Sequence, residues 1–278
     1  MLRDAVAQFK RAALCFGHGT HNARDEAVYL ILHTLGLSLG ELDAVLARQL
    51  SAREIDAVRA IVRRRVRERK PAAYLTREAW LGQFRFYVDE RVIVPRSFIA
   101  ELLRSGLNVA RARSVLDLCT GSGCLAVLAA HRYPHARIDA ADLSAAALQV
   151  ARRNVKDYAL GARIRLVKSD LFDRLDGRKY DLILSNPPYV DAEAMRALPR
   201  EYRHEPRAAL AGGRDGLALV RRILAQAAAN LNPHGTLVVE IGHNRSALEE
   251  ACPRLPFIWL DTSAGDDYVF MLQREDLL

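Results

Sequence analysis

The four residues Asn186-Pro187-Pro188-Tyr189 carry the most informative chemistry of this chain. They follow the apolar run 180–185, which predicts a buried strand that ends in a turn. The two prolines fix the backbone, so the Asn186 amide is aimed by a rigid segment. Asn186 Oδ1 and the Pro187 carbonyl can accept both N–H groups of an incoming –NH₂, with the Tyr189 ring on its flat face. The motif predicts a holder for a planar amino or amide nitrogen, although the tetrapeptide taken alone is better explained as a proline-rich turn.

A glycine-containing loop upstream favours the first interpretation. The run 115–126 predicts a short strand, a loop with Gly121 and Gly123, and a helix that begins near Gly123. These glycines let the backbone approach a ligand closely, and the start of a helix favours negative or electron-rich groups. The next predicted strand ends at Asp142, from where a carboxylate can hold a ribose diol. Ligands of open α/β sheets bind at the edge formed by the carboxyl ends of the strands.

Two cofactor classes fit this loop. Gly121-x-Gly123-x-x-Ala126 satisfies the dinucleotide fingerprint, so a nicotinamide dehydrogenase is one candidate. Asp117 at the end of the strand suits a cationic ammonium better than a pyrophosphate. Hydride transfer also has no obvious use for Asn-Pro-Pro-Tyr. The combination favours methyl transfer from S-adenosylmethionine.

The bulk composition describes a soluble globular protein. Of the 278 residues, 50% are hydrophobic and 27% are charged, and no apolar run approaches the roughly 20 residues of a membrane span. The start of the chain lacks the apolar stretch of a signal peptide, and the four cysteines form no C-x-x-C pair. We therefore expect a cytoplasmic protein with free thiols. The eight histidines show no ligand spacing, so no metal is assigned.

The amino-terminal part is basic and predicted to be helical. Residues 1–79 hold 14 Lys and Arg against 9 Asp and Glu. Residues 1–70 predict four helices, the third opened by the capping box Ser38-x-x-Glu41 and the fourth by Ser51-x-x-Glu54. The stripe Ile55, Val58, Val62 and Val66 predicts that the arginines at 63–65 lie on the opposite, solvated face. Contact of this face with ribosomal RNA or an assembling particle is a further hypothesis.

The remaining chain predicts a hairpin and then a doubly wound sheet. Phe84–Val88 and Arg91–Val94 predict two strands that turn at residues 89–90. From residue 114, strands alternate with helices, which is typical of an α/β, Rossmann-like, seven-stranded core. The predicted strands are 114–119, 136–141, 164–168, 180–185, 235–241, 257–260 and 268–273, with helices near 123–132, 144–158, 216–231 and 245–251. The expected divisions are a helical recognition domain over 1–79, a β-hairpin linker over 80–96 and a catalytic domain over 97–278. The polar stretch 190–215 is a candidate lid.

With these motifs in place, the chain resembles the HemK-type protein glutamine N5-methyltransferases over nearly its whole length. The resemblance rests on residues 186–189, on 117–123 and on the Pro95-Arg96 step. Within the family, 86–97 and 201–206 are most similar to the branch that methylates a glutamine of the third large-subunit ribosomal protein. The sister branch acts on release factors and usually has Pro-Arg-Pro-Asp-Thr-Glu after the hairpin. Phe98 departs from the proline typical of the ribosomal branch, and we expect this change to alter the start of one helix without affecting the chemistry.

The resemblance implies S-adenosylmethionine as the cofactor and a glutamine-bearing protein, such as a ribosomal protein, as the partner. The residues expected to bind the cofactor are Asp117, Cys119, Thr120, Gly121, Ser122, Gly123, Asp142, Asp170, Leu171 and Asn186. Those expected to act in catalysis are Asn186, Pro187 and Tyr189, and the substrate is expected to contact these three, Pro188 and Arg96. Asp170 is equally well explained as a helix cap or turn residue. Arg96 and Glu101 either line the substrate entrance or form an exposed ion pair.

Two rival functions share part of this pattern. An adenine or guanine amino methyltransferase on DNA or RNA also needs two acceptors for an exocyclic –NH₂, and the net charge of +8 suits it. The helical cap and the low aromatic content of 7% argue against a base-stacking surface. A catalytically idle RNA-binding module is the second rival, and the presence of Asp117, Asp142 and Asn186 argues against it.

Overall fold

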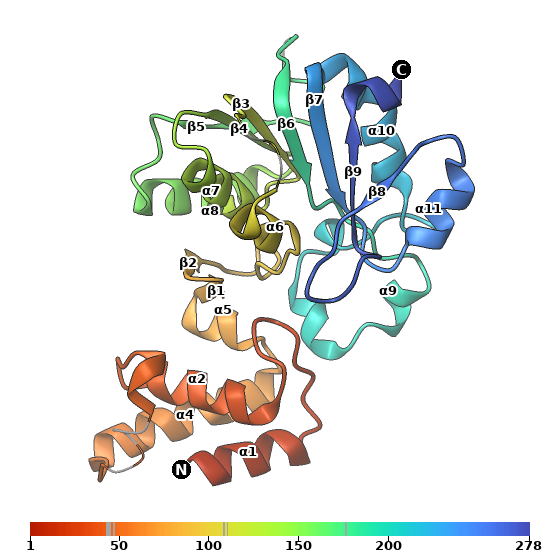
Figure 1. The fold of residues 1–278 in the computed structure, drawn as a ribbon. Coiled ribbons are helices and arrows are strands. Elements are labelled where there is room, and N and C mark those ends of the chain that lie inside the picture. Colours follow the sequence, from red (N-terminus) through yellow and green to blue (C-terminus); the bar gives the residue numbers. More distant parts are fainter. Residues whose placement is uncertain (43–45, 47, 108, 110, 176) are drawn as a thin grey trace.

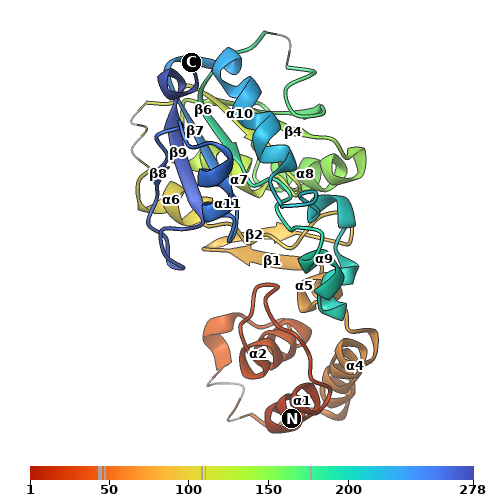
Figure 2. The same ribbon diagram turned by 90° about the vertical axis from the view of Figure 1, so that its right-hand side faces the viewer.

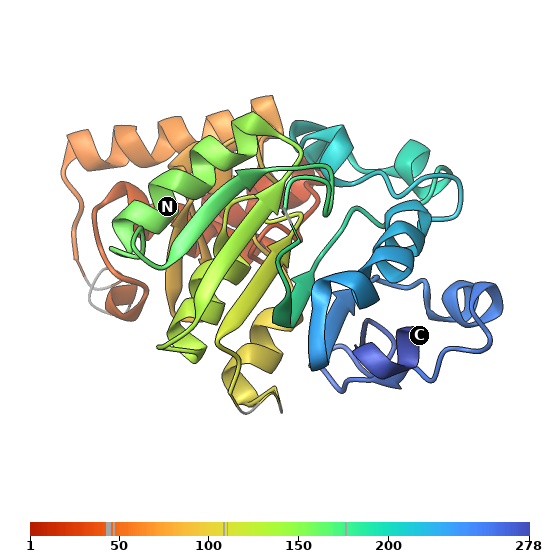
Figure 3. The same ribbon diagram turned by 90° about the horizontal axis from the view of Figure 1, so that it is seen from above.

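The computed structural model of the chain describes residues 1–42, 46, 48–107, 109, 111–175 and 177–278. A seven-stranded sheet lies above a group of amino-terminal helices, with a two-stranded hairpin between them (Figure 1). The same arrangement is seen after a quarter turn (Figure 2) and from above, where the amino-terminal helices lie beneath the sheet (Figure 3).

The large sheet has the strand order β5-β4-β3-β6-β7-β9-β8. Neighbours from β5 to β7 are parallel, whereas β9 runs antiparallel to both β7 and β8. The strands are β3 (Ser114–Leu118), β4 (Arg137–Asp142), β5 (Ile164–Lys168), β6 (Tyr180–Ser185), β7 (Leu231–Glu240), β8 (Ile258–Trp259) and β9 (Val269–Gln273). All seven predicted strands are confirmed, β5 and β6 with the predicted ends and the others with shifted ends. Because β3, β4, β5 and β6 are parallel, their carboxyl ends meet at one edge, where the predicted site residues follow.

Helices cover both faces of the sheet. Alternate strand residues point to opposite faces, as Leu182 and Leu184 do against Ile183. On the Leu182 face pack α6 (Ile99–Ser105), α7 (Cys124–Arg132) and α8 (Ala145–Asp157). On the Ile183 face pack α10 (Ala218–Asn230) and α11 (Arg245–Ala251). Short helical turns complete the chain: α9 (Ala194–Ala197), η2 (Arg200–His204), η3 (Arg207–Ala209) and η4 (Arg274–Leu277). No helix within the described ranges is both long and apolar enough to span a membrane.

The amino-terminal helices have their own apolar core. They are α1 (Leu2–Arg11), α2 (Ala23–Thr34), η1 (Leu39–Glu41), α4 (Ala52–Glu68) and α5 (Ala72–Thr76). Phe9, Leu30, Val58 and Val62 are buried together in this unit. The two predicted capping boxes are present at Ser38 and Ser51. The third predicted helix falls partly on 43–45 and 47, which lie outside the described residues.

The prediction that all the arginines of α4 face solvent is wrong for Arg65. Its side chain is completely buried, and its Nε donates to Glu26 Oε1 at 2.7 Å. Arg63 and Arg64 are exposed as predicted. A helical position beside the apolar stripe can hold a guanidinium when a carboxylate from another element meets it there, and the helical period alone does not show this.

The predicted hairpin has a different first strand. β2 (Phe84–Tyr87) pairs antiparallel with β1 (Glu78–Leu81), so the hairpin begins before residue 80. The turn uses Gly82, whose φ of +61° favours glycine. The run 91–94 forms no strand because its backbone groups are bound elsewhere. Tyr74 donates to the Val92 carbonyl, and the Val94 N–H donates to Glu205 at 2.9 Å.

Candidate active site

The loop after β3 is held by buried side chains. The Asp117 carboxylate accepts from Thr120 Oγ1 at 2.5 Å and from the Ala126 N–H at 3.0 Å, which ties the strand end to the first turn of α7. Asn154 of α8 donates to the Ser122 carbonyl at 2.8 Å. Burial raises the pKa of Asp117 to about 7. Asp117, Thr120 and Ser122 are buried, so these predicted cofactor-binding residues brace the loop from beneath.

Close packing explains the second glycine of the loop. Gly123 has a φ of +79°, and a Cβ there would lie 3.1 Å from the Ala151 Cβ of α8. Gly121 has a φ of +55° and open space around it, and its N–H donates to Asp142 Oδ2 at 2.9 Å. The structure therefore brings Gly121 and Asp142 together across the ends of the neighbouring strands β3 and β4.

A cavity of about 210 Å³ opens at these strand ends. Of the predicted cofactor-binding residues it is lined by Cys119, Gly121, Asp142, Asp170, Leu171 and Asn186. Burial raises the pKa of Asp142, although the Ser144 and Gly121 N–H groups hydrogen-bond to its carboxylate. The remaining lining is largely apolar, with Ile93, Ala141 and Pro188 among it.

The donor set of this cavity fits S-adenosylmethionine. Asp142 offers carboxylate lone pairs for a ribose diol, and the apolar walls suit an adenine ring. Asp170 lines the cavity but also pairs with Arg222 at 3.1 Å, so part of its charge is used within the protein. The lining has two carboxylates, Asp142 and Asp170, against one cation, Arg91, whose charge is paired with Asp89, and this balance favours a cationic ligand over a pyrophosphate.

Asn186-Pro187-Pro188-Tyr189 follows β6 directly and separates the first cavity from a second. Ser185 anchors the end of β6 by donating to the Leu118 carbonyl at 3.1 Å. The second cavity has a volume of about 180 Å³ and is lined by all four motif residues. Asn186 and Pro188 line both cavities. Asn186 therefore stands where it can contact a ligand of either cavity.

Three residues that the sequence analysis missed hold Tyr189 in place. A Cβ on Gly242 would lie 2.6 Å from the Tyr189 ring, and one on Gly216 would lie 2.4 Å from its carbonyl oxygen. Asn244 donates to the same carbonyl at 2.9 Å. Gly216 is thus packed closely against the backbone of Tyr189. Gly242 lies two residues after the end of β7, and a glycine so close to the end of a predicted strand is a signal that the sequence offered.

Arg96 lies in the wall of the second cavity but not in the predicted ion pair. Its two Nη atoms each lie 2.6 Å from a different carboxylate oxygen of Glu205, and its guanidinium covers the Tyr202 ring at 5.4 Å. Glu101 instead accepts from the Ser263 N–H and Oγ at 3.0 and 2.7 Å. Arg96 pairs with Glu205, which lies 109 residues away in the sequence, and not with the nearby Glu101. The reason is that Glu205 offers Arg96 a buried carboxylate with bidentate geometry.

Two further buried carboxylates near this wall were not predicted. Arg96 holds the pKa of Glu205 down at about 2, against the opposing effect of burial. Glu240, at the end of β7, accepts from Ser97 Oγ at 2.6 Å and from the Phe98 N–H at 2.9 Å, and burial raises its pKa to about 7. The Phe98 ring, at the position that departs from the family pattern, packs against Tyr268 at 5.0 Å.

Comparisons with known proteins agree with this architecture. The family model of the methyltransferase small domain matches residues 98–203, and that of the PrmC N-terminal domain matches residues 1–76. The ribosomal protein uL3 glutamine methyltransferase of Neisseria gonorrhoeae is 59% identical over 100% of this chain and 94% of the relative. The enzyme of the same name from Burkholderia pseudomallei is 54% identical over the same shares. A solved methyltransferase of Pyrococcus furiosus, 16% identical, shares the fold with a TM-score of 0.51 over 68% of this chain and 88% of that one.

Proposed function

Because this chain belongs to the ribosomal protein uL3 glutamine methyltransferase family, we propose that it methylates the side-chain amide nitrogen (N5) of a glutamine in ribosomal protein uL3. The methyl donor is S-adenosylmethionine. The observation that carries the proposal is that two cavities share Asn186 and Pro188 in their linings. One cavity has the donor set for the cofactor, and the other is lined by the predicted amide holder.

The cofactor supplies an electrophilic methyl group on a sulfonium. In our proposal Cys119, Gly121, Asp142, Asp170 and Leu171 contact it from the ends of β3, β4 and β5. The buried Asp117, Thr120 and Ser122, with Gly123, keep the loop in the shape that the cavity needs. The second cavity, which the substrate amide would enter, is called the acceptor cavity from here on. Arg96 shapes its wall through the ion pair with Glu205.

The amide nitrogen needs help because its lone pair is delocalised into the carbonyl. Asn186 Oδ1 and the Pro187 carbonyl accept its two N–H groups and stabilise the positive charge that develops on nitrogen. The same contacts aim the nitrogen along the line of the methyl group. The N–C bond forms as the S–C bond breaks, and one proton then leaves the nitrogen for solvent, so a strong base is unnecessary. Pro188 and Tyr189 bracket the amide plane.

The test is methyl transfer from labelled S-adenosylmethionine to three purified acceptors: uL3, a peptide-chain release factor and ribosomal RNA. We expect label on uL3, and peptide mass spectrometry should place it on a glutamine. Label on the release factor would assign the chain to the sister activity. Label on RNA alone would overturn the proposal in favour of a nucleobase amino methyltransferase.

We further propose that α4 contacts ribosomal RNA of an assembling particle in the cytoplasm. Arg53, Arg59 and Arg63 are exposed along this helix, and each can release counterions from a phosphate backbone. The Arg59→Gln variant should bind ribosomal RNA with a salt slope lower by about one. Arg152→Gln, on the exposed side of α8, is the matched control. Equal slopes for both variants and the unchanged protein would refute the contact.

A further inference from the structure

The loop formed by residues 190–211 connects the acceptor cavity to the amino-terminal helices. It begins directly after Tyr189, and its ends are joined by a bridge between Val190 and Ala211. Leu198 and Tyr202 from its middle line the acceptor cavity. Figures 1 and 2 both show the part around α9 lying between the sheet and the amino-terminal helices.

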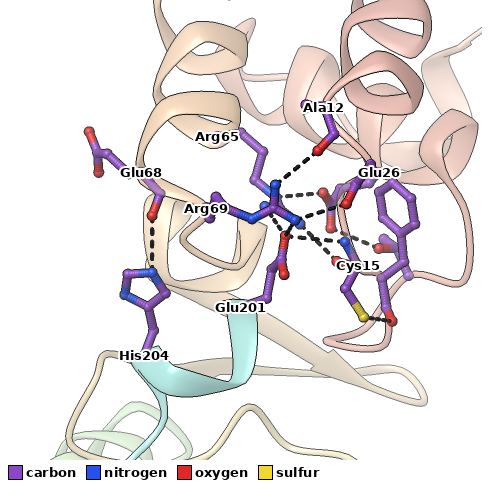
Figure 4. Close-up of polar contacts among 11 residues, drawn as sticks. Ala12, Cys15, Glu26, Arg65, Glu68, Arg69, Glu201 and His204 are labelled. Atoms are coloured by element: carbon purple, nitrogen blue, oxygen red, sulfur yellow. Dashed lines mark hydrogen bonds and ion pairs between the residues drawn. The ribbon is translucent and has the colours of Figure 1, made fainter. Parts of the chain in front are cut away.

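Glu201 of this loop is buried in the amino-terminal unit (Figure 4). Its Oε1 accepts from the Cys15 N–H at 3.1 Å and from Arg69 Nη2 at 2.9 Å, and lies 3.6 Å from Arg65 Nη1. Arg65 is held in turn by Glu26 at 2.7 Å and by the Cys15 carbonyl at 3.0 Å. The cluster of Glu26, Arg65, Arg69 and Glu201 therefore contains two positive and two negative groups.

Neighbouring residues of the loop make contacts in the same direction. His204 Nε2 lies 3.0 Å from the Glu68 carbonyl, and the Tyr202 ring lies 4.3 Å from the ring of His18. Tyr202 is thus both a wall of the acceptor cavity and the residue next to the buried carboxylate. A shift of Glu201 has to move this wall.

A buried ion cluster is rarely a large source of stability, since desolvation offsets most of its attraction. It does fix one geometry, because displacing Glu201 would remove a carboxylate from both Arg65 and Arg69 and leave the Cys15 N–H without its acceptor. We propose that Glu201 is a positioning residue, through which the amino-terminal helices set the acceptor cavity for its protein substrate. This inference rests on the proposed function and adds to it a residue outside both cavities.

The Glu201→Gln variant tests the inference. We expect the KM for the protein substrate to rise about tenfold, with kcat within about threefold. Tyr189 is held independently through Gly216, Gly242 and Asn244, and Asn186 directly follows β6 outside this loop, so the chemical step should persist. The Kd of the cofactor by calorimetry should stay within about twofold. Glu205 still ties the Pro206 side of the cofactor cavity to Val94 and Arg96. Glu193→Gln, the same change at an exposed position of the same loop, should match the unchanged protein.

Hydrogen–deuterium exchange without any substrate separates this inference from the proposed function. In Glu201→Gln, amides of residues 194–204 should exchange at least several-fold faster than in Glu193→Gln, whichever acceptor the enzyme uses. Should Glu201→Gln fail to fold, His204→Ala removes a milder contact of the same loop and should raise exchange and KM in the same direction. An unchanged exchange pattern, or a cofactor affinity that falls as much as the KM rises, would overturn the role of Glu201.

Discussion

At the scale of single residues, position at a strand end decides which side chains take part in the chemistry. Asn186 stands where β6 ends, beside two cavities, and the prolines behind it restrict its backbone. Asp117 stands at the equivalent end of β3, yet its side chain points into the protein and holds the loop. The sequence located both residues at the ligand edge. It could not distinguish a carboxylate that faces a ligand, such as Asp142, from one that faces the loop, such as Asp117, because both stand near the carboxyl ends of predicted strands.

Asn186→Ala should lower turnover by about a hundredfold or more, as expected for loss of a preorganised acceptor. Cofactor affinity should change little, since Asn186 contributes a small part of that cavity's lining. Rate assays and calorimetry on the same preparation measure the two effects. Asn230→Ala, at the end of α10 and away from both cavities, is the control. An equal loss of affinity and turnover would contradict this division of roles.

The buried Glu240 should make the free energy of unfolding decrease as the pH rises to 7 and above. Its pKa is raised to about 7 by burial, with Arg96 opposing that effect and Tyr189 lying close enough to respond to its charge. A raised pKa contributes stability below the unfolded pKa of about 4.3, and this is lost as the pH rises through 7. Glu240→Gln should gain stability relative to the unchanged protein between pH 5 and pH 8, by roughly 1 kcal/mol or more. Urea unfolding at the two pH values measures this, and an unchanged difference would exclude the effect.

At the scale of elements, the pattern of apolar residues predicted all strands of the large sheet but only one of the two strands of the hairpin. Apolar runs with turn signals located β3, β4 and β6, which are buried along most of their length as inner parallel strands are, and also the partly buried edge strand β5. The partner of β2 was wrong because the run 91–94 has the composition of a strand while its backbone is bound by Tyr74 and Glu205. Pairing depends on such distant side chains, and a local pattern contains no information about them.

Gly212 tests how tightly the base of the 190–211 loop is packed. A Cβ there would lie 2.7 Å from the Tyr189 Cα and 2.6 Å from the Gly216 carbonyl, and neither backbone atom can move without disturbing the motif. Gly212→Ala should lower the free energy of unfolding by about 1–3 kcal/mol and reduce turnover. Gly161→Ala, at a position with open space, should stay within about 0.5 kcal/mol. If urea unfolding gave the two substitutions the same effect, a methyl group at position 212 would fit beside Tyr189 and Gly216, and the prediction would be wrong.

At the scale of the whole molecule, the amino-terminal helices and the sheet are joined by buried charges. Arg65 and Glu201 form one junction, and Arg96 with Glu205 forms another beside His18, whose Nε2 lies 3.7 Å from Glu205. The sequence predicted a basic helical unit but placed its charge on the outside. Such junctions escape prediction because each half is an ordinary charged residue in its own helix or loop, and only the fold brings the halves together.

The Glu205 junction should make the whole molecule sensitive to acid. Its pKa is lowered to about 2, so its contribution is fully present above the unfolded pKa of about 4.3 and is lost as the pH falls towards 2. That contribution is roughly 3 kcal/mol at pH 7 and less than half of it at pH 3. Glu205→Gln should therefore destabilise the protein strongly at pH 7 and much less at pH 3. Glu193→Gln should show no such difference. If urea unfolding gave Glu205→Gln the same deficit at both pH values, the loss would come from packing, and the charge of Glu205 would not be what joins the loop to Arg96.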